Sequence, residues 1–276
     1  MLPGTPIKEE EQEDGYLRFF SKLPPPRNLE KAWHVPFNLN EKPRLRTLRA
    51  QMSVDEILKE ARKYNVSITE YITAVYMYSL QKIYLEEKEQ GHNQKRKIIR
   101  CEVPVNMRNK YPSRTMRNFS LFVMPEIDPR LGIYDFDEVV RNVHYQIRAE
   151  SETKQITRFL SSNVHYEKLL MIRILPLFIK KMAIAAIYRG LGSKKSSGII
   201  TNLGNISLPG GMEDYIDNVH VTPTPPNTRV RVTCALVSYK GKLNICFANL
   251  TEKKDLEKHM LSHLSASGIK VRITEN

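Results

Sequence analysis

The sequence has few cysteines and no secretory signal. Only three of its 276 residues are cysteine, Cys101, Cys234 and Cys246, and their spacing fits neither a disulfide framework nor a metal site. All three lie in apolar or strand-like runs, so we predict buried free thiols in a reducing compartment, the cytoplasm. The first fifteen residues are acidic and contain no apolar core, so we expect no signal peptide.

No hydrophobic run is long enough and free enough of charge to predict a membrane span. The nearest is residues 169–191, LLMIRILPLFIKKMAIAAIYRGL, which contains four cations and a proline. Each charge near the centre of a bilayer costs about 2.5–3.5 kcal/mol. The segment therefore favours a largely buried helix of a soluble protein without a transmembrane segment. The alternative is a helix that lies in a membrane interface.

The common catalytic and nucleotide-binding motifs are also missing. The sequence has no Gly-x-Gly-x-x-Gly that opens a helix, no P-loop, no His-Glu-x-x-His and no Gly-x-Ser-x-Gly. His259 and His263 have the spacing of two metal ligands on one helical face, but no cysteine or carboxylate cluster supports them. We therefore expect no metal site. His220 alternates within a strand-like run, where we expect a buried structural histidine.

Positive charge is what the sequence has in excess, with a formal net charge of +13. Residues 95–118 contain eight cations and one anion, and their local net charge is more than half of the net charge of the chain. The tract is either a solvated loop between strands or an anion site for a phosphate-bearing cofactor. Nucleic acid is the weaker prediction, because the sequence has no RNP-type or helix-turn-helix pattern.

The spacing of apolar residues predicts helices and strands in groups. Residues 1–42 are rich in proline and predict an extended arm, which Trp33 and Phe37 anchor on the remaining body, residues 43–276. Capping boxes at 53–56 and 67–70 begin two helices, which end near Tyr64 and Glu86. Further predicted helices cover 135–150, 153–165, 168–190 and 251–268. Predicted strands cover 45–51, 97–106, 118–128, 197–204, 218–224, 269–274 and a hairpin over 229–249 that turns at Lys240-Gly241.

This order of elements predicts an α/β fold with a mixed β-sheet flanked by helices. Within it, four stretches follow one another: ITEYITAVYMYSLQ, RCEVPVNMRNKYPSRTMRNFSLFVMPEID, SSGIITNLGNISLP and VTCALVSYKGKLNICFAN. Together they resemble the C-terminal half of a condensation-domain or alcohol-acetyltransferase-like protein. That superfamily has the chloramphenicol-acetyltransferase-like fold and contains CoA- or carrier-dependent acyltransferases. The resemblance covers about residues 45–274.

The resemblance implies a site at a tunnel between two lobes. In the family, the tunnel admits an acyl thioester from one side and an alcohol or amine from the other. By motif match, Arg108 and Asn118 line the tunnel, and Asn202 of the TNLG stretch is a further tunnel-lining residue. Arg114 and Arg117 would bind a phosphate of the cofactor. The implied co-substrate is an acyl-CoA or acyl-carrier thioester, with no tightly bound cofactor.

One departure concerns the catalytic histidine. The general base of the family is the second histidine of a His-His-x-x-x-Asp-Gly motif. The one Asp-Gly here, Asp14-Gly15, has Glu10 at the place of that histidine. We therefore predict no catalytic residue in this chain. The resemblance implies that an N-terminal lobe, from the same gene or a separate chain, or self-association, completes the protein, with residues 1–42 as an interlobe linker.

Three functions remain open from the sequence. The chain is the C-terminal lobe of an acyltransferase, inactive alone and acting on a small-molecule acyl donor and acceptor. Alternatively, it is a non-catalytic basic binding or interaction module. In the third case it is an enzyme that uses one of its own histidines, for example His165 or His220.

Overall fold

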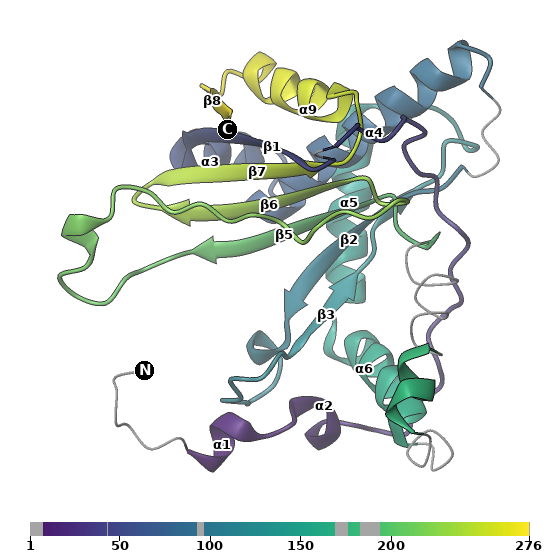
Figure 1. Ribbon diagram of the computed structural model, residues 1–276, viewed down its shortest axis with the longest axis vertical. Helices are drawn as coiled ribbons and strands as arrows, with labels where there is room; N and C mark the ends of the chain where they lie inside the picture. Colours follow the sequence, from purple (N-terminus) through teal and green to yellow (C-terminus); the bar gives the residue numbers. More distant parts are fainter. Residues whose placement is uncertain (1–7, 43, 93–96, 169–175, 183–193, 276) are drawn as a thin grey trace. The chain divides into compact units, whose positions relative to one another are not determined.

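The chain divides into two units, each assembled from three separate stretches. Figure 1 labels the helices and strands that they contain. The computed structural model describes residues 8–42, 44–92, 97–168, 176–182 and 194–275. Unit 1 comprises Met1–Leu29, Pro104–Val123 and Arg148–Gly192. Unit 2 comprises Glu30–Val103, Met124–Ile147 and Ser193–Asn276.

The described residues contain an eight-stranded mixed sheet, as the sequence predicts. In unit 2 the strand order is β2-β5-β6-β7-β1-β8, and β4 pairs with β2. Strands β2, β5 and β6 run parallel, whereas β6, β7, β1 and β8 are antiparallel neighbours. The last residues of β2 belong to unit 1, where β3 is their neighbour. The strands are β1 (Arg46–Ser53), β2 (Ile99–Asn106), β3 (Ser120–Val123), β4 (Glu126–Ile127), β5 (Gly198–Asn205), β6 (Val232–Tyr239), β7 (Lys242–Asn249) and β8 (Arg272–Glu275).

The hairpin of β6 and β7 lies at the centre of the sheet. Lys240 and Gly241 form its turn with positive φ angles of 46° and 72°, as a two-residue hairpin of this type requires. All eight residues of β6 are buried, which fits a strand covered on both faces. The predicted hairpin and the predicted strands at 45–51, 97–106, 197–204 and 269–274 are confirmed.

One of the two predicted capping boxes is present in the structure. Ser67 and Glu70 form the predicted capping box at the start of α4. The box predicted at Ser53 is wrong: Ser53 accepts from the backbone of Asp55, while the Glu56 carboxylate accepts from the backbone N–H of Lys270 at 2.8 Å. The labelled helices of the described residues are α1 (Glu9–Gln12), α2 (Gly15–Arg18), α3 (Val54–Lys63), α4 (Ile68–Glu89), α5 (Phe136–Glu150), α6 (Thr153–Lys168) and α9 (Asp255–Ala266), and the labelled 3₁₀ turns are η1 (Met107–Asn109) and η3 (Glu213–Tyr215).

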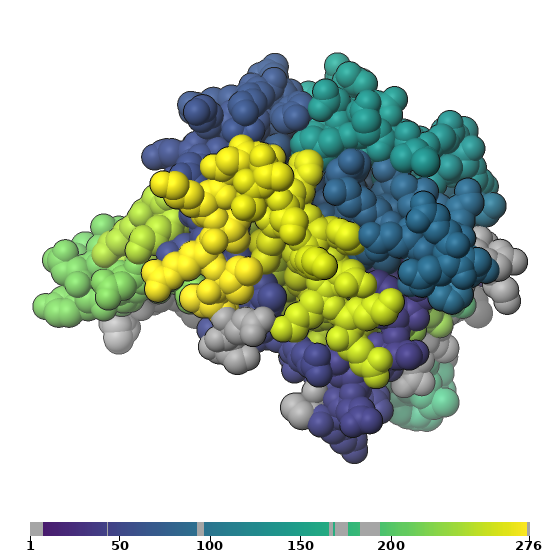
Figure 2. Space-filling view, turned by 90° about the horizontal axis from the view of Figure 1, so that it is seen from above, coloured from purple at the N-terminus to yellow at the C-terminus, as the bar shows by residue number. Residues whose placement is uncertain are grey.

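Helix α9 packs against α4, and Figure 2 shows the C-terminal residues, in yellow, on the surface of unit 2. Gly268, with a φ of 89°, ends α9 as predicted, because this left-handed conformation suits glycine. On the inner side of α9, Glu257 is buried and accepts a hydrogen bond from the Asn249 amide at 2.7 Å. Burial raises the pKa of the Glu257 carboxyl.

Two predicted strands differ in the structure. Residues 218–224 form no strand. They are held instead by side chains: the Asn244 amide donates to the carbonyl of Val219, and the Thr233 hydroxyl donates to the carbonyl of Thr224. The predicted strand 118–128 is split into β3 and β4 at Pro125, because proline has no N–H to donate to a ladder.

The N-terminal arm contains the two one-turn helices α1 and α2 and then runs extended. Trp33 and Phe37 are buried, as predicted, and the Trp33 backbone N–H donates to the carbonyl of Ile98 at 2.7 Å. The three cysteines are buried free thiols, also as predicted. The domain boundary between residues 42 and 43 stays a prediction.

The predicted helix 168–190 lies mostly outside the described residues. Residues 177–182 are helical, and Leu177, Phe178 and Met182 are each at least 66% exposed. This part of the segment is therefore not buried, contrary to the prediction. Among the described helices, none is long and apolar enough to cross a membrane.

Candidate functional site

The basic loop, residues 106–118, follows β2 and is cross-linked by Arg108. The Asn106 side chain accepts from the Arg108 backbone N–H at 3.1 Å and so starts η1. The Arg108 guanidinium donates from Nε to the carbonyl of Thr115 at 2.7 Å and from Nη2 to the carbonyl of Arg117. Arg108 thus holds the two sides of the loop together.

The acidic arm, residues 9–14 of the N-terminal arm, also binds this loop. The hydroxyl of Ser113 donates to the Glu13 carboxylate at 2.6 Å, and the hydroxyl of Thr115 donates to the Glu13 carbonyl at 2.6 Å. The hydrogen bond from Ser113, together with Arg18, lowers the pKa of Glu13. Arg114 lies 3.8 Å from the Glu10 carboxylate. Part of the positive charge of the loop is therefore balanced within unit 1.

A hydrophobic core beneath the loop fixes its position. In β3, alternate residues are buried, and Phe119 just before it is 1% exposed. A Cβ on Gly15 would lie 3.0 Å from the Phe119 ring, so a larger residue at the start of α2 would require the ring to shift by a few tenths of an ångström. The core residues are Met107, Phe119, Leu121, Ile156, Leu160 and Val164, with Tyr16, Phe19, Phe20, Val105, Tyr111 and Phe159 packed against them.

The structure brings four of the five predicted site residues together in this loop. Arg114, Arg117 and Asn118 are exposed, whereas Arg108 is partly buried. The side-chain oxygen Oδ1 of Asn118 accepts a hydrogen bond from the hydroxyl of Ser120 at 2.9 Å, a local bond at the start of β3. The side chains of Arg114 and Arg117 are therefore accessible to solvent.

The fifth predicted residue, Asn202, belongs to unit 2. Its amide donates to the hydroxyl of Thr69, in the first turn of α4, at 2.9 Å. The side-chain oxygen Oδ1 of Asn202 accepts from the backbone N–H of Gly204 at 2.8 Å. This bond lies next to a register shift between β5 and β6. Gly204 has a φ of 76°, which favours glycine there. Asn202 therefore joins the end of β5 to the start of α4.

The histidines singled out from the sequence have different surroundings in the structure. His220 is exposed and lies 3.0 Å from the Asn218 amide, so the expectation of a buried histidine is wrong. His259 lies 3.0 Å from the Glu86 carboxylate, while His263 packs on the ring of Phe136. Burial lowers the pKa of His263. Within the described part of the chain, no group of three His, Cys, Asp or Glu residues could hold a metal ion.

Asp14, of the one Asp-Gly pair, has a structural task. Its carboxylate caps α2 by accepting from the backbone N–H groups of Tyr16 and Leu17 at 3.0 and 3.1 Å. It therefore stabilises the start of the helix whose Gly15 and Tyr16 contact Phe119.

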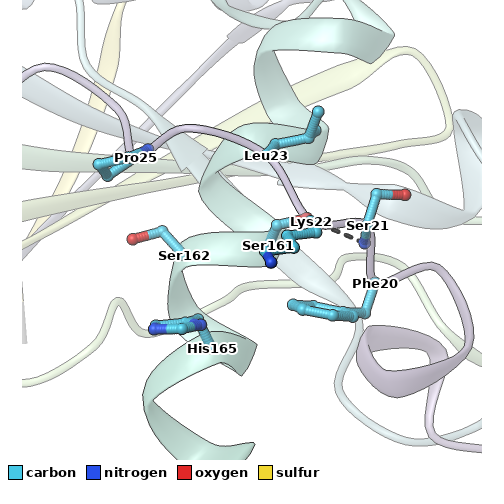
Figure 3. Close-up of a pocket in the computed structure, with 8 residues that line it drawn as sticks. All are labelled: Phe20, Ser21, Lys22, Leu23, Pro25, Ser161, Ser162 and His165. Carbon is cyan, nitrogen blue, oxygen red and sulfur yellow. Dashed lines mark hydrogen bonds between the residues drawn. The ribbon is translucent and has the colours of Figure 1, made fainter.

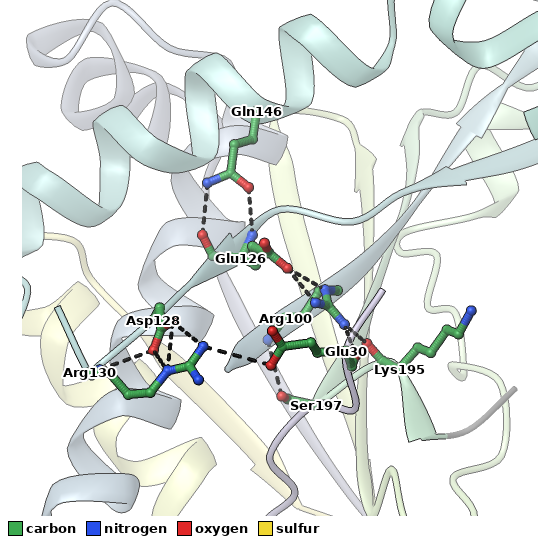
Figure 4. A network of polar contacts seen from close by, with 8 residues as sticks. All are labelled: Glu30, Arg100, Glu126, Asp128, Arg130, Gln146, Lys195 and Ser197. Carbon is green, nitrogen blue, oxygen red and sulfur yellow. Dashed lines mark hydrogen bonds and ion pairs between the residues drawn. The ribbon is translucent and has the colours of Figure 1, made fainter. Parts of the chain in front are cut away.

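Sequence reasoning missed a polar network around Arg100 in unit 2 (Figure 4). The Arg100 side chain is fully buried and pairs with the Glu126 carboxylate, to which Nε donates at 2.7 Å. Nη1 donates to the carbonyls of Glu30 at 2.8 Å and Lys195 at 2.7 Å. The signal in the sequence is an arginine of the basic tract that lies inside the apolar run KIIRCEV of the predicted strand 97–106.

Unit 1 also contains a cavity of about 330 Å³ between the arm and α6 (Figure 3). The arm contributes residues 20–25 and α6 contributes residues 161–165. Its lining residues are Phe20, Ser21, Lys22, Leu23, Pro25, Ser161, Ser162 and His165. Of the predicted candidates, only His165 lies at this cavity.

Comparison with solved structures shows which proteins share this fold. The structure of this chain is similar to that of the nonribosomal peptide synthetase FmoA3, with a TM-score of 0.53, 15% identity, and coverage of 87% of this chain and 24% of that one. The trichothecene 15-O-acetyltransferase of Fusarium sporotrichioides gives a TM-score of 0.51 and 11% identity, over 86% of this chain and 48% of that one. The cyclization-docking bidomain of the synthetase EpoB from Sorangium cellulosum gives 0.51 and 13%, over 86% and 44%.

The chain therefore has the chloramphenicol-acetyltransferase-like fold of condensation domains and acetyltransferases, as the sequence resemblance predicts. Neither a protein-family model nor a curated protein sequence matches it. The chain spans less than half the length of each of these similar proteins.

Proposed function

We propose that this chain is the C-terminal lobe of an acyltransferase that moves an acyl group from a CoA or carrier thioester to an alcohol or amine. The observation that carries the proposal is the fold, which matches acyl-transfer proteins over 86–87% of the chain. The chain covers less than half of each of those proteins, which supports a second lobe as partner. The three buried thiols support a reducing, cytoplasmic location.

The proposed site residues act in two ways. Arg108 shapes the basic loop through its bonds to two carbonyls, and Asn118 ends the loop where β3 begins. Arg114 and Arg117, both exposed, are proposed to meet the phosphate groups of the acyl donor. Asn202 is proposed to shape the substrate path from unit 2, through its bonds at the end of β5.

The general base is proposed to come from the partner lobe. In this fold class it takes the proton of the acceptor as the acceptor attacks the thioester, and such catalysis typically contributes about 10²–10⁴-fold. This sequence has no His-His-x-x-x-Asp-Gly motif. Positioning of the two substrates would also be incomplete without the facing lobe.

The purified chain alone should therefore show no acyltransferase turnover, and a co-expressed N-terminal lobe should restore it. The test measures thioester cleavage with a panel of alcohols and amines, with and without that lobe. The same samples are run on a sizing column, because an uncovered lobe face should associate with the partner lobe or with itself. Robust turnover by the chain alone, abolished by replacing one histidine such as His165 or His220, would instead favour an enzyme that uses its own histidine.

CoA binding tests the basic loop separately. Arg117→Ala should weaken CoA binding by about tenfold, because it removes a charge-assisted hydrogen bond to phosphate. Arg108→Ala should weaken it as well, because the loop loses its cross-link. Raising the salt concentration should reduce CoA affinity in the native chain. Calorimetric titration measures these affinities, with Lys154→Ala, an exposed cation of α6, as the matched control. Unchanged CoA binding in both arginine variants would favour the interpretation of the tract as a solvated loop.

A further inference from the structure

The cavity between the arm and α6 contains none of the site residues proposed above and is a second candidate binding site of unit 1. Both of its walls belong to unit 1. One wall is the extended arm from Phe20 to Pro25, and the other is the face of α6 that carries Ser161, Ser162 and His165 (Figure 3). Its volume of about 330 Å³ lies at the lower end of the range of small-molecule pockets.

The inner surface of the cavity is mostly apolar. Phe20, Leu23 and Pro25 supply this surface from the arm, while α6 adds two small serines that leave the space open. Ser161 is 2% exposed, and its hydroxyl oxygen accepts from the backbone N–H of Ser21 at 3.2 Å. This hydrogen bond holds the arm against α6 at one side of the cavity, which is called the slot below.

Positive charge lies around the cavity, and none of its eight lining residues is acidic. Lys22 lines it directly. Lys168, one turn beyond His165, places its ammonium 3.8 Å from the centre of the Phe20 ring. Arg158 donates to the carbonyl of Pro25 at 2.9 Å and so brings a third cation to the same part of the arm. A ligand here meets an apolar interior and cations beside it.

We propose that this cavity binds an aliphatic carboxylate of medium chain length. The hydrocarbon chain fills the slot against Phe20, Leu23 and Pro25. The carboxylate stays near the surface, where the Lys22 ammonium pairs with it, since a lysine can lie along apolar surface with its charge in water. A flexible chain suits a narrow slot between an extended segment and a helix. The ligand should carry one negative charge, because Lys22 is the one lysine or arginine among the lining residues, and Lys168 and Arg158 lie beside the cavity.

Calorimetric titration of the full chain with octanoate, hexanoate and octanol tests the proposal. Octanoate should bind saturably at one site. Hexanoate should bind more weakly, by about fourfold for each methylene that no longer enters the cavity. Octanol should bind more weakly than octanoate, because it lacks the charge that pairs with Lys22. Equal binding of octanol and octanoate, or equal binding of hexanoate and octanoate, would overturn the proposal.

Two pairs of variants locate the site. Ser162→Leu fills the slot from α6 and should weaken octanoate binding by at least tenfold, whereas Asn163→Leu, exposed on the next position of the same helix, should leave it unchanged. Lys22→Gln should weaken octanoate binding but not octanol binding, with Lys154→Gln as its control. If Ser162→Leu fails to fold, Leu23→Trp fills the slot from the partly exposed arm. Octanoate binding that survives both filling variants would place it elsewhere and refute the assignment.

Discussion

Arg100→Met is expected to lower the free energy of unfolding of unit 2 by about 3–5 kcal/mol, the usual loss when one partner of a buried ion pair is removed. The Arg100 side chain is 0% exposed and joins stretches that are distant in sequence. It pairs with Glu126 in β4 and donates to the carbonyls of Glu30 and Lys195 (Figure 4). Methionine fills a similar space but provides no donor, so all three acceptors lose their guanidinium partner.

Urea unfolding followed by far-UV circular dichroism measures this loss. The matched control is Arg130→Met, since Arg130 pairs with Asp128 in the same region but is 47% exposed, and exposed ion pairs contribute little. The control should unfold at an unchanged urea concentration. Glu126→Gln combined with Arg100→Met completes a double-mutant cycle and isolates the pair. An unfolding midpoint of Arg100→Met equal to that of the control would show that the network is not needed for stability.

The second large effect is expected in unit 1, where Phe119→Ala should cost about 3–5 kcal/mol, as truncation of a buried phenylalanine does. Phe119 is 1% exposed and contacts Tyr16 edge-on at 5.2 Å and Phe19 at 6.0 Å between ring centres. Its backbone carbonyl also accepts from the N–H of Met107. The cavity left by the ring would loosen the arm on one side and the basic loop on the other.

Hydrogen exchange read residue by residue distinguishes a loss in unit 1 from a loss in the whole chain. In Phe119→Ala, protection should fall at the amides of Met107 and Ser120, whereas amides of β6 should change less. Phe122→Ala is the control, because Phe122 lies on the exposed side of β3 at 43% exposure. Its effect should stay within about 0.5 kcal/mol, the usual range for surface positions. Equal losses in the two variants would mean that the Phe119 ring does not organise the core of unit 1.

The features that the sequence predicted correctly depend on residues close together in the chain. The Lys240-Gly241 turn requires only its own backbone angles, and the capping box of Ser67 and Glu70 spans four residues. The mixed sheet followed from the order of such local elements, and the resemblance supplied the fold as a whole. The positions of Arg108 and Asn118 in one loop followed from their spacing in the sequence.

The features that the sequence did not predict depend on distant partners. Glu56 was expected to cap its own helix but accepts from Lys270, 214 residues later. Arg100 belongs to the tract predicted as either a solvated loop or an anion site, and nothing near it in sequence identifies Glu126 and two carbonyls as its partners. Residues 218–224 alternate like a strand, yet side chains from β6 and β7 donate to the carbonyls of Val219 and Thr224. The predicted roles of Arg114, Arg117 and Asn202 stay predictions.

The interleaving of the two units has a consequence for how the chain matures during translation. Unit 1 needs residues from the first 29 and from the stretch 148–192, and unit 2 needs the last β-strand at Arg272–Glu275. Multidomain chains generally fold their N-terminal domain first as it leaves the ribosome. Here neither unit is complete when the first half has been synthesised, so the acidic arm and the apolar strand β2 must wait for sequence that is made later. Nascent chains stalled near residue 150 are therefore expected to depend on chaperones, while chains synthesised beyond Glu275 can complete both units together.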